Sequence, residues 1–139
     1  MPTSADPLLL DTSCAIALVQ PQHAKHGVVR EVLRGKPLGL AGHAEFETYS
    51  VLTRLPAPSR LTPAAALRLI SVNFPATRRL PASRAATALQ ELASLGLAGG
   101  ATYDGLVGLA ARHHDLRLAS SDLRAVSTYH ALGIDVLVL

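Results

Sequence analysis

Acidic side chains occur at the predicted beginnings of four helices, and no other feature of this sequence points as clearly to chemistry. In chain order they are Asp11, Glu45, Glu47, Asp104 and Asp122. Taken singly, each is explained by helix capping or by a favourable interaction with the helix dipole. Taken together at one edge of a sheet, carboxylates repel one another and raise each other's pKa unless a cation lies among them. Mg²⁺ or Mn²⁺ is the expected cation, because hard cations prefer carboxylate oxygens and Mg²⁺ keeps several of its waters.

Short apolar strands that alternate with helices would bring these acids to one edge. The predicted strands cover residues 8–10, 37–43, 116–120 and 135–139, with a marginal further strand at 76–81. Such alternation is typical of right-handed βαβ units, in which ligands bind beyond the carboxyl ends of the strands. We therefore expect an α/β fold, a three-layer α/β/α sandwich with a mostly parallel sheet of four to five strands.

Seven helices are predicted between these strands, from helical spacing of apolar residues and from stop signals at Gly and Pro. They cover residues 12–19, 23–35, 44–55, 63–74, 84–97, 103–114 and 122–132. Thr62, Ser83 and Thr102 are the predicted N-caps of the fourth, fifth and sixth helices. Pro63 follows Thr62 at the first helical position, where a missing backbone N–H costs nothing.

Helical periodicity constrains which acids can point inward. Asp104 shares a helical row with Val107 and Ala111, so it borders the buried stripe of its helix and can point into a cleft. Glu45 and Glu47 flank the buried stripe of their helix on opposite sides. Periodicity alone leaves open which of these two glutamates belongs with the aspartates.

Length and composition predict one compact domain, residues 1–139, because 49% of the residues are hydrophobic. Aromatic residues make up only 4% of the chain, so the core must consist mainly of aliphatic side chains. The formal charge is +3, with eleven Arg and two Lys. Arg suits phosphate because its planar fork donates two hydrogen bonds at once, and the charge therefore permits a nucleic-acid partner without requiring one.

Cysteine usage and hydropathy predict the compartment. Cys14 is the only cysteine, which excludes an internal disulfide and a cysteine zinc site, and we expect it to be buried as a small hydrophobic residue. The N-terminal segment 1–7 has no cationic region, and no apolar run approaches 18 residues. We therefore expect a cytoplasmic protein with no secretion signal and no membrane segment.

Four sequence segments, in this order, resemble the PIN-domain family, and more narrowly the VapC-type toxins of bacterial toxin-antitoxin pairs. The resemblance extends over nearly the whole chain. The segments are LLLDTSCAIAL (8–18), AGHAEFETYSVLTRLP (41–56), ATYDGLVGLAARHHDLRLASSDLRA (101–125) and GIDVLVL (133–139). The family's fold, a parallel sheet between helices, agrees with the pattern of predicted strands and helices.

The resemblance implies a set of site residues. The implied catalytic acids are Asp11, Glu47, Asp104 and Asp122, which chooses Glu47 over Glu45. Asp11 and Asp104 would be the main metal ligands, with Glu47 and Asp122 acting directly or through water. The hydroxyl residue that precedes the family's fourth acid corresponds to Ser120, in a supporting role. Secondary candidates are Thr12 and Ser13, which could support the metal site but for which helix capping is the simpler role.

The resemblance also implies an activity and partners. The implied activity is Mg²⁺-dependent endonucleolytic cleavage of cellular RNA, leaving 5′-phosphate and 3′-hydroxyl ends, with inhibition by a cognate antitoxin. It further implies a homodimer, with the antitoxin bound across the cleft. No motif in the sequence identifies the RNA, because target choice depends on surface shape and loop contacts.

Other basic residues are weaker candidates. Six arginines could contact RNA phosphates, or could equally be ordinary solvated side chains: Arg78, Arg79, Arg84, Arg112, Arg117 and Arg124. Arg124 is the preferred candidate because it lies two residues after Asp122. The histidines at 23 and 26 and at 113 and 114 lack further ligands with metal-site spacing, so a histidine metal site is not expected.

Three other functions fit parts of the pattern. A phosphatase with an aspartyl nucleophile after the first strand would suit Asp11, but this class has a second Asp two residues on, where this chain has Ser13. A receiver-like binding module would have paired acids near the first strand and a Lys near the last strands, and both are missing. A catalytically silent PIN-like binding module remains an alternative, although all four acids are present.

Overall fold

A parallel sheet of four short strands lies at the centre of the molecule. The computed structural model describes residues 2–3 and 5–139. The strands are β1 (Leu8–Leu10), β2 (Leu38–Leu40), β3 (Leu118–Ser120) and β4 (Val136–Val138). Their spatial order is β2-β1-β3-β4, and every pairing is parallel. The chain places β2 on one side of β1 and β3 on the other, so the order of the strands reverses at β1. In such sheets, ligands bind beyond the carboxyl ends of the strands at this point of reversal.

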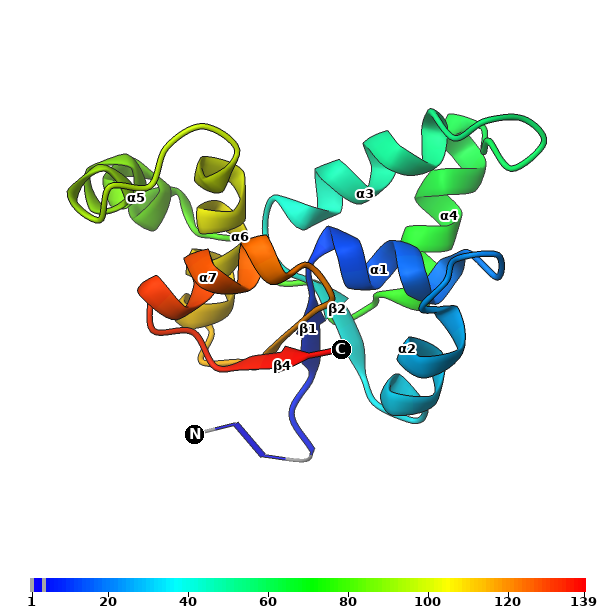
Figure 1. Ribbon diagram of the computed structural model, residues 1–139, viewed down its shortest axis with the longest axis horizontal. Coiled ribbons are helices and arrows are strands. Elements are labelled where there is room, and N and C mark those ends of the chain that lie inside the picture. Colours follow the sequence, from blue (N-terminus) through cyan, green and yellow to red (C-terminus); the bar gives the residue numbers. More distant parts are fainter. Residues whose placement is uncertain (1, 4) are drawn as a thin grey trace.

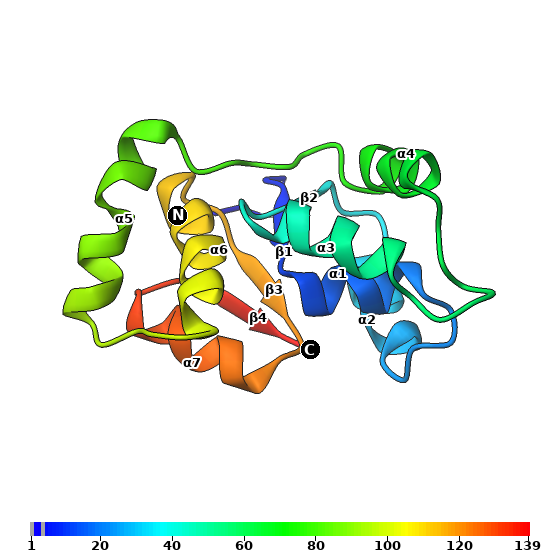
Figure 2. The same ribbon diagram turned by 90° about the horizontal axis from the view of Figure 1, so that it is seen from above.

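In the part of the chain that the structure describes, seven helices surround the sheet in two groups. They are α1 (Thr12–Val19), α2 (His26–Leu33), α3 (Ala44–Thr53), α4 (Pro63–Asn73), α5 (Ala82–Ser94), α6 (Ala101–His113) and α7 (Leu123–Ala131). Figure 1 and the view from above in Figure 2 show α1 to α4 on one side of the molecule and α5 to α7 on the other. Within the described residues, no helix combines the length and the apolar character needed to cross a membrane.

Two hydrophobic cores correspond to these two groups of helices. Leu8 and Leu10 of β1 pack in one core with side chains of α1 to α4. Leu9 belongs to the other core, which α5, α6 and α7 complete. Successive side chains of a strand point to opposite faces, so the two cores cover the two faces of the sheet. The predicted three-layer α/β/α sandwich with a mostly parallel sheet is confirmed.

The predicted strand at 76–81 is wrong, although part of this segment follows the sheet. The backbone N–H of Ala76 donates to the Leu38 carbonyl at 2.9 Å, and that of Arg78 to the Leu40 carbonyl at 3.1 Å. Between them, the Leu40 N–H donates to the Thr77 hydroxyl at 3.0 Å instead of to a backbone carbonyl. This side-chain acceptor interrupts the ladder, and only an isolated bridge between Ala41 and Arg78 remains.

Glycine is required where this segment crosses β2. A Cβ atom at Gly39 would overlap the backbone of Ala76 and Thr77. The close approach allows residues 76–78 to hydrogen-bond along the outer edge of β2. Gly39 therefore fixes the position of the chain that enters α5.

Three predicted helix beginnings need correction. The Thr62 cap is confirmed, since its hydroxyl accepts from the Ala65 N–H at 3.2 Å. The caps at Ser83 and Thr102 are wrong, because α5 begins after Pro81 and α6 after Gly100. Proline presets its own φ, and the flexible glycine pair gives α6 its turn, so both helices begin without a capping side chain. Likewise α2 begins at residue 26 rather than 23, after a series of turns. Met1 and Ser4, in the segment 1–7 considered for a leader, lie outside the described residues.

Candidate active site at the carboxyl ends of the strands

Four acidic residues reach the middle of the molecule from four helices. Asp11 ends β1 and caps α1, and Asp122 follows β3 and caps α7. Glu47 lies near the beginning of α3, and Asp104 in the first turn of α6. In Figure 1, α1 and α3 lie on one side of this region and α6 and α7 on the other. The structure thus directs the four sequence-predicted acids towards one place.

The pKa of Asp104 responds to the charges of the other three acids. Burial raises the pKa of Asp104, and the negative charges of Asp122, Glu47 and Asp11 raise it further, to about 6. Arg124 opposes this rise. Charges act on one another in this way only over short distances or through a poorly screening interior. The four carboxylates therefore form one electrostatic cluster.

Asp11 is the most rigidly held of these acids. The residue is only 3% exposed. Oδ1 accepts from the Ser13 hydroxyl at 2.6 Å and from the Cys14 N–H at 3.1 Å, and Oδ2 accepts from the Tyr129 hydroxyl at 2.9 Å. Burial raises the pKa of Asp11, and the hydrogen bonds from Ser120, Ser13, Cys14 and Tyr129 oppose that rise. The carboxylate is thus fixed in position before any ligand arrives.

Hydroxyl groups connect the turn after β1 to the turn after β3. Ser13, which donates to Asp11, also accepts from the Ser121 N–H at 3.0 Å. The buried Ser120 hydroxyl accepts from the Asp122 N–H at 3.1 Å. Both contacts fit the supporting role expected of Ser13 and Ser120, because they hold Asp11 and Asp122 in a fixed relation.

Helix capping is not the role of Thr12 or Ser13. The N-cap of α1 is Asp11, whose side chain accepts from the Cys14 N–H. Thr12 instead has a buried hydroxyl without a hydrogen-bond partner among the described residues. Cys14 is buried as predicted. Burial, and to a smaller extent the charge of Asp11, raise the pKa of its thiol to about 12.

The two glutamates of α3 have different surroundings. Glu45 receives two hydrogen bonds from the Arg79 guanidinium, at 2.8 and 2.6 Å, and is therefore neutralised. Glu47 has no such partner: its Oε1 atom is buried without a hydrogen bond and lies 3.5 Å from His43 Nε2. Of the two, only Glu47 has its charge coupled to Asp104. The contacts thus favour Glu47, in agreement with the sequence resemblance.

An open groove with a volume of about 520 Å³ adjoins the cluster. Asp122 and Arg124 line it from α7, together with Thr12, Ser13 and Lys25. The Arg124 side chain is 96% exposed, and its Nε lies 3.8 Å from Asp122 Oδ1. Lys25 Nζ donates to the carbonyls of Ser121 and Leu139, at 3.3 and 3.1 Å. The groove therefore carries positive charge beside the acids.

The acids fit a hydrated divalent cation. In the described part of the chain, no three or more His, Cys, Asp or Glu side chains form a ready-made metal cage. The cluster instead offers carboxylates with raised pKa, together with buried oxygens of Thr12 and Glu47 that have no hydrogen-bond partner. Mg²⁺ suits such an arrangement, because it binds through one or two carboxylates and keeps its remaining waters.

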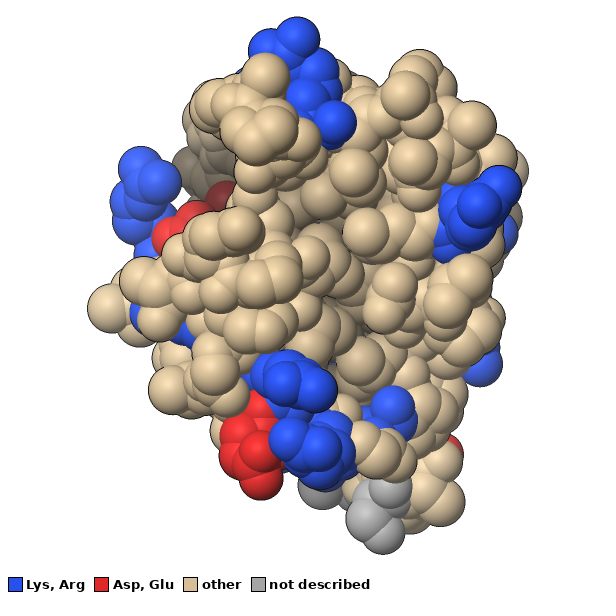
Figure 3. All heavy atoms as spheres, turned by 90° about the vertical axis from the view of Figure 1, so that its right-hand side faces the viewer, with Lys and Arg blue, Asp and Glu red and all other residues tan. Residues whose placement is uncertain are grey.

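Most of the candidate RNA-binding arginines make contacts within the protein. Arg78 donates to the carbonyls of Ala76 and Thr77, and Arg79 pairs with Glu45. Arg117 lies 3.3 Å from Asp135. On the face shown in Figure 3, Lys and Arg lie around the periphery, and several gather at the lower edge next to an acidic side chain. Arg124 is the one of the six arginines that lies beside the acids.

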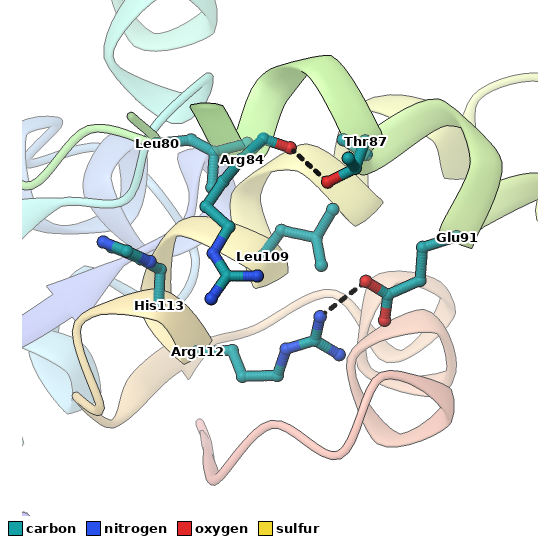
Figure 4. Close-up of a pocket in the computed structure, with 8 residues that line it drawn as sticks. Leu80, Arg84, Thr87, Glu91, Leu109, Arg112 and His113 are labelled. Carbon is teal, nitrogen blue, oxygen red and sulfur yellow. Dashed lines mark hydrogen bonds and ion pairs between the residues drawn. The ribbon is translucent and has the colours of Figure 1, made fainter. Parts of the chain in front are cut away.

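A second group of charged residues lies between α5 and α6, around a hollow of about 230 Å³ (Figure 4). Arg112 Nη2 donates to Glu91 Oε1 at 2.7 Å, and its Nη1 donates to the Leu132 carbonyl at 3.1 Å. Arg84, Thr87 and His113 complete the polar lining. The side-chain hydrogen bond from Arg112 is the main cause that lowers the pKa of Glu91. Here opposite charges are paired.

Three residues of the site escape prediction from the sequence. Tyr129 holds Asp11 from a position 118 residues further along the chain. His43 approaches Glu47, and Lys25 lies beside the groove. A buried Tyr next to a polar cleft is the only available signal, since its hydroxyl needs a partner. The local pattern around Tyr129 reads as an ordinary helical core position.

Comparison with known proteins gives one family. The PIN-domain model matches residues 8–130. Ribonuclease VapC27 of Mycobacterium tuberculosis is 43% identical over 132 residues, covering 95% of this chain and 96% of that protein. Ribonuclease VapC40 of the same species is 41% identical over 131 residues, covering 91% and 94%.

Solved structures give the same fold at low sequence identity. The crystal structure of VapBC2 from Rickettsia felis, bound to a DNA fragment from its promoter, contains a chain that superposes with a TM-score of 0.67. Its sequence identity is 12%, and the match covers 96% of this chain and 99% of that one. At this identity the likeness concerns the fold alone.

Proposed function

The chain belongs to the PIN-domain family and to its VapC-type branch, and from that premise we propose that it is a metal-dependent endoribonuclease, the toxin of a toxin-antitoxin pair. The observation that carries the proposal is the cluster of four carboxylates, in which burial of Asp104 and the charges of Asp122, Glu47 and Asp11 raise the pKa of Asp104 to about 6. A group of like charges at the carboxyl ends of the strands costs stability unless a cation binds there. RNA cleavage assisted by Mg²⁺ or Mn²⁺ is the chemistry that such a group supports best.

Each acid of the cluster has a distinct role in this proposal. Asp11 and Asp104 would hold the cation, because Asp11 is fixed by its hydrogen bonds, and burial together with the other three acids raises the pKa of Asp104. Glu47 and Asp122 complete the site directly or through water. A bound divalent cation neutralises charge on the scissile phosphodiester and makes a water molecule more acidic. The product ends are 5′-phosphate and 3′-hydroxyl.

Supporting residues hold this arrangement in place. Ser13 and Ser120 fix the two turns that carry Asp11 and Asp122. Thr12 contributes its unpartnered hydroxyl to the edge of the site. Arg124, highly exposed beside the acids, contacts a phosphate of the RNA.

Partners follow from the same family membership. The structure with the similar fold is VapBC2 bound to a DNA fragment from its promoter. For this chain, we propose a cognate antitoxin that covers the site. A homodimer in the cytoplasm is the proposed assembly, and cellular RNA is the proposed substrate.

Cleavage of RNA by the purified chain tests the activity. Wild type, Asp11→Asn and Asp104→Asn are incubated with total RNA and Mg²⁺ or Mn²⁺. Wild type is expected to cut and both variants to lose activity, because each substitution removes a charge that holds the cation. Glu31→Gln is the matched control, since this exposed acid pairs only with Arg34 on α2 and its loss should leave cleavage unchanged.

Two results would contradict the proposal. Equal cleavage by wild type and both variants would assign the activity to a contaminant or to another site. Harmless expression of an active enzyme, with no growth arrest to be relieved by co-expression of the neighbouring gene, would contradict the toxin role.

A further inference from the structure

The exposed aromatic residues of this protein are concentrated beside the acids. The chain has only two Phe and three Tyr. Phe74 and Tyr129 are buried, whereas Phe46, Tyr49 and Tyr103 are 66%, 37% and 52% exposed. All three exposed rings belong to α3 or to the first turn of α6. These helices also carry two of the four acids.

Three rings, termed the aromatic row, are linked through His43, which contacts the other two. His43, just before α3, stacks on Tyr103 with ring centroids 5.1 Å apart and an interplanar angle of 21°. Phe46 also lies near His43, with ring centroids 6.3 Å apart and an interplanar angle of 40°. His43 Nε2 is 3.5 Å from Glu47 Oε1, and Tyr103 directly precedes Asp104. The row therefore borders the acidic cluster.

Core packing does not account for these rings. A single exposed hydrophobic side chain is ordinary on a protein surface. Here, however, Phe46 and Tyr103 are both more than half exposed, are joined through one further ring, and lie within one residue of an acid of the site. Unpaired RNA bases stack on aromatic side chains of this kind, whereas bases within a duplex are inaccessible to them.

We propose that His43, Phe46 and Tyr103 form a stacking platform for an unpaired RNA base next to the cleaved phosphodiester. The platform deepens the proposed ribonuclease function and rests on it. An RNA strand fits better than a protein helix because the rings adjoin a group proposed to hold phosphate through a cation, and because Arg124 supplies positive charge on α7. The substrate is then single-stranded, or looped, at the site of cleavage.

Binding of a fluorescent oligonucleotide tests the platform without cleavage. The wild-type chain is mixed with a single-stranded oligoribonucleotide that carries 2-aminopurine at one position, and Ca²⁺ replaces Mg²⁺ so that the carboxylates hold a cation while the RNA stays uncut. Stacking quenches 2-aminopurine, so we expect quenching on binding, and weaker binding of the same oligonucleotide in a duplex. Tyr103→Leu and Phe46→Leu should remove quenching and raise Kd roughly 5- to 100-fold. Tyr103→Phe and Phe46→Trp keep a ring and should retain both.

Tyr49→Leu is the matched control, because Tyr49 is an exposed aromatic residue of the same helix, outside the row. It should leave quenching and Kd unchanged. Far-ultraviolet circular dichroism of each variant checks folding, and the ring-retaining variants keep the test informative if a leucine variant fails to fold.

Three outcomes would overturn the platform. In the first, the leucine variants bind and quench as the parent does. In the second, Tyr49→Leu weakens binding as much as Tyr103→Leu. In the third, the leucine variants keep RNA binding but lose the cognate antitoxin, which makes the rings a protein-binding surface. Failure of the ribonuclease assignment is recognised separately, as absence of RNA cleavage by wild type in Mg²⁺ or Mn²⁺, and no RNA binding by wild type in Ca²⁺ would also overturn the platform.

Discussion

The two ends of α6 carry charged groups that are organised in opposite ways. At its beginning, Asp104 is surrounded by other acids, and burial together with their charges raises its pKa to about 6. At its end, Arg112 pairs with Glu91 at 2.7 Å, and this hydrogen bond lowers the pKa of the glutamate. The same helix therefore carries one cluster of like charges and one neutralised pair.

The difference suggests a structural role for the charged pair and a functional role for the acidic cluster. The pair at the end of α6 is complete within the protein and needs no ligand, so its contribution is structural and modest. In the proposed function a cation completes the acidic cluster, and without that cation the fold bears the cost of its repulsion. Electrostatic strain of this kind is typical of functional sites, although ion-pair networks can also perturb pKa values.

The rate of RNA cleavage should show the largest difference between substitutions in the two regions. Asp11→Asn is expected to lower the rate of RNA cleavage at least about 100-fold, because it removes a charge that holds the cation. Glu91→Gln should leave the rate unchanged, since Glu91 lies in the other group. Rates measured with saturating Mg²⁺ on one RNA test the contrast, and a similar loss in both variants would erase the distinction between the regions.

Metal ions should stabilise only the acidic cluster. Mg²⁺ at a hundred times its Kd should raise the free energy of unfolding by about 2–3 kcal/mol, because it binds the folded state alone. Asp104→Asn should abolish this gain, and Glu91→Gln should preserve it. Thermal unfolding with Mg²⁺ or with EDTA measures the difference; equal Mg²⁺ stabilisation of wild type and Asp104→Asn would place the cation elsewhere.

The pH dependence of stability should have opposite signs in the two regions. The folded-state pKa of Asp104 is about 6, above its ordinary value of 3.8, so the folded state binds more protons than the unfolded state between these values. Without metal, the contribution of Asp104 to stability is therefore lost as pH rises through this window. The pKa of Glu91 is lowered, so its contribution is present above its ordinary value of 4.5 and is lost as pH falls through the lowered pKa.

Urea unfolding in EDTA measures whether the Asp104 carboxylate raises or lowers the free energy of unfolding. Asp104→Asn should be more stable than wild type at pH 7.5 by about 1–2 kcal/mol once solvent screening is allowed for, and the gap should shrink at pH 4.5. A variant that is less stable than wild type at pH 7.5 would contradict the view that repulsion dominates at this site.

The smallest effect is expected at the charged pair. Glu91→Gln should lower the free energy of unfolding by about 0.5–1 kcal/mol at pH 7, because both partners are partly exposed and the pair is screened. Chemical denaturation of wild type and variant provides the measurement. A loss several times larger would mean that the contacts of Arg112, including the one to the Leu132 carbonyl, depend on the glutamate.

Much of the fold could be predicted because it is encoded locally. The apolar run at 8–10 and its helix-forming continuation predict a buried strand followed by a helix, and the structure has both. The end of the ladder at 76–78 could not be predicted, because it depends on a contact between the Thr77 hydroxyl and the distant Leu40 N–H. Helix beginnings at α5 and α6 were missed because Pro81 and Gly100 set them without a capping side chain.

The candidate site divides in the same way. The positions of Asp11, Asp104 and Asp122 follow from strand and helix order, whereas periodicity leaves Glu45 and Glu47 equivalent. The resemblance chooses Glu47, and the pairing of Glu45 with Arg79, 34 residues away, provides an independent physical reason. The hydrogen bond from Tyr129 to Asp11 joins two segments that are distant in the sequence, and no local pattern encodes it.

The chain segment at 76–78 also bears on aggregation. Exposed strand edges allow sheets of different molecules to pair, and this segment already occupies the outer edge of β2. At the opposite side of the sheet, no strand of the described residues pairs with the outer edge of β4. This strand has only three residues, and Asp135, which directly precedes it, is paired with Arg117. So short an edge offers few hydrogen bonds to a second molecule. The overproduced chain should therefore resist fibril formation at its sheet edges, even when no partner covers it.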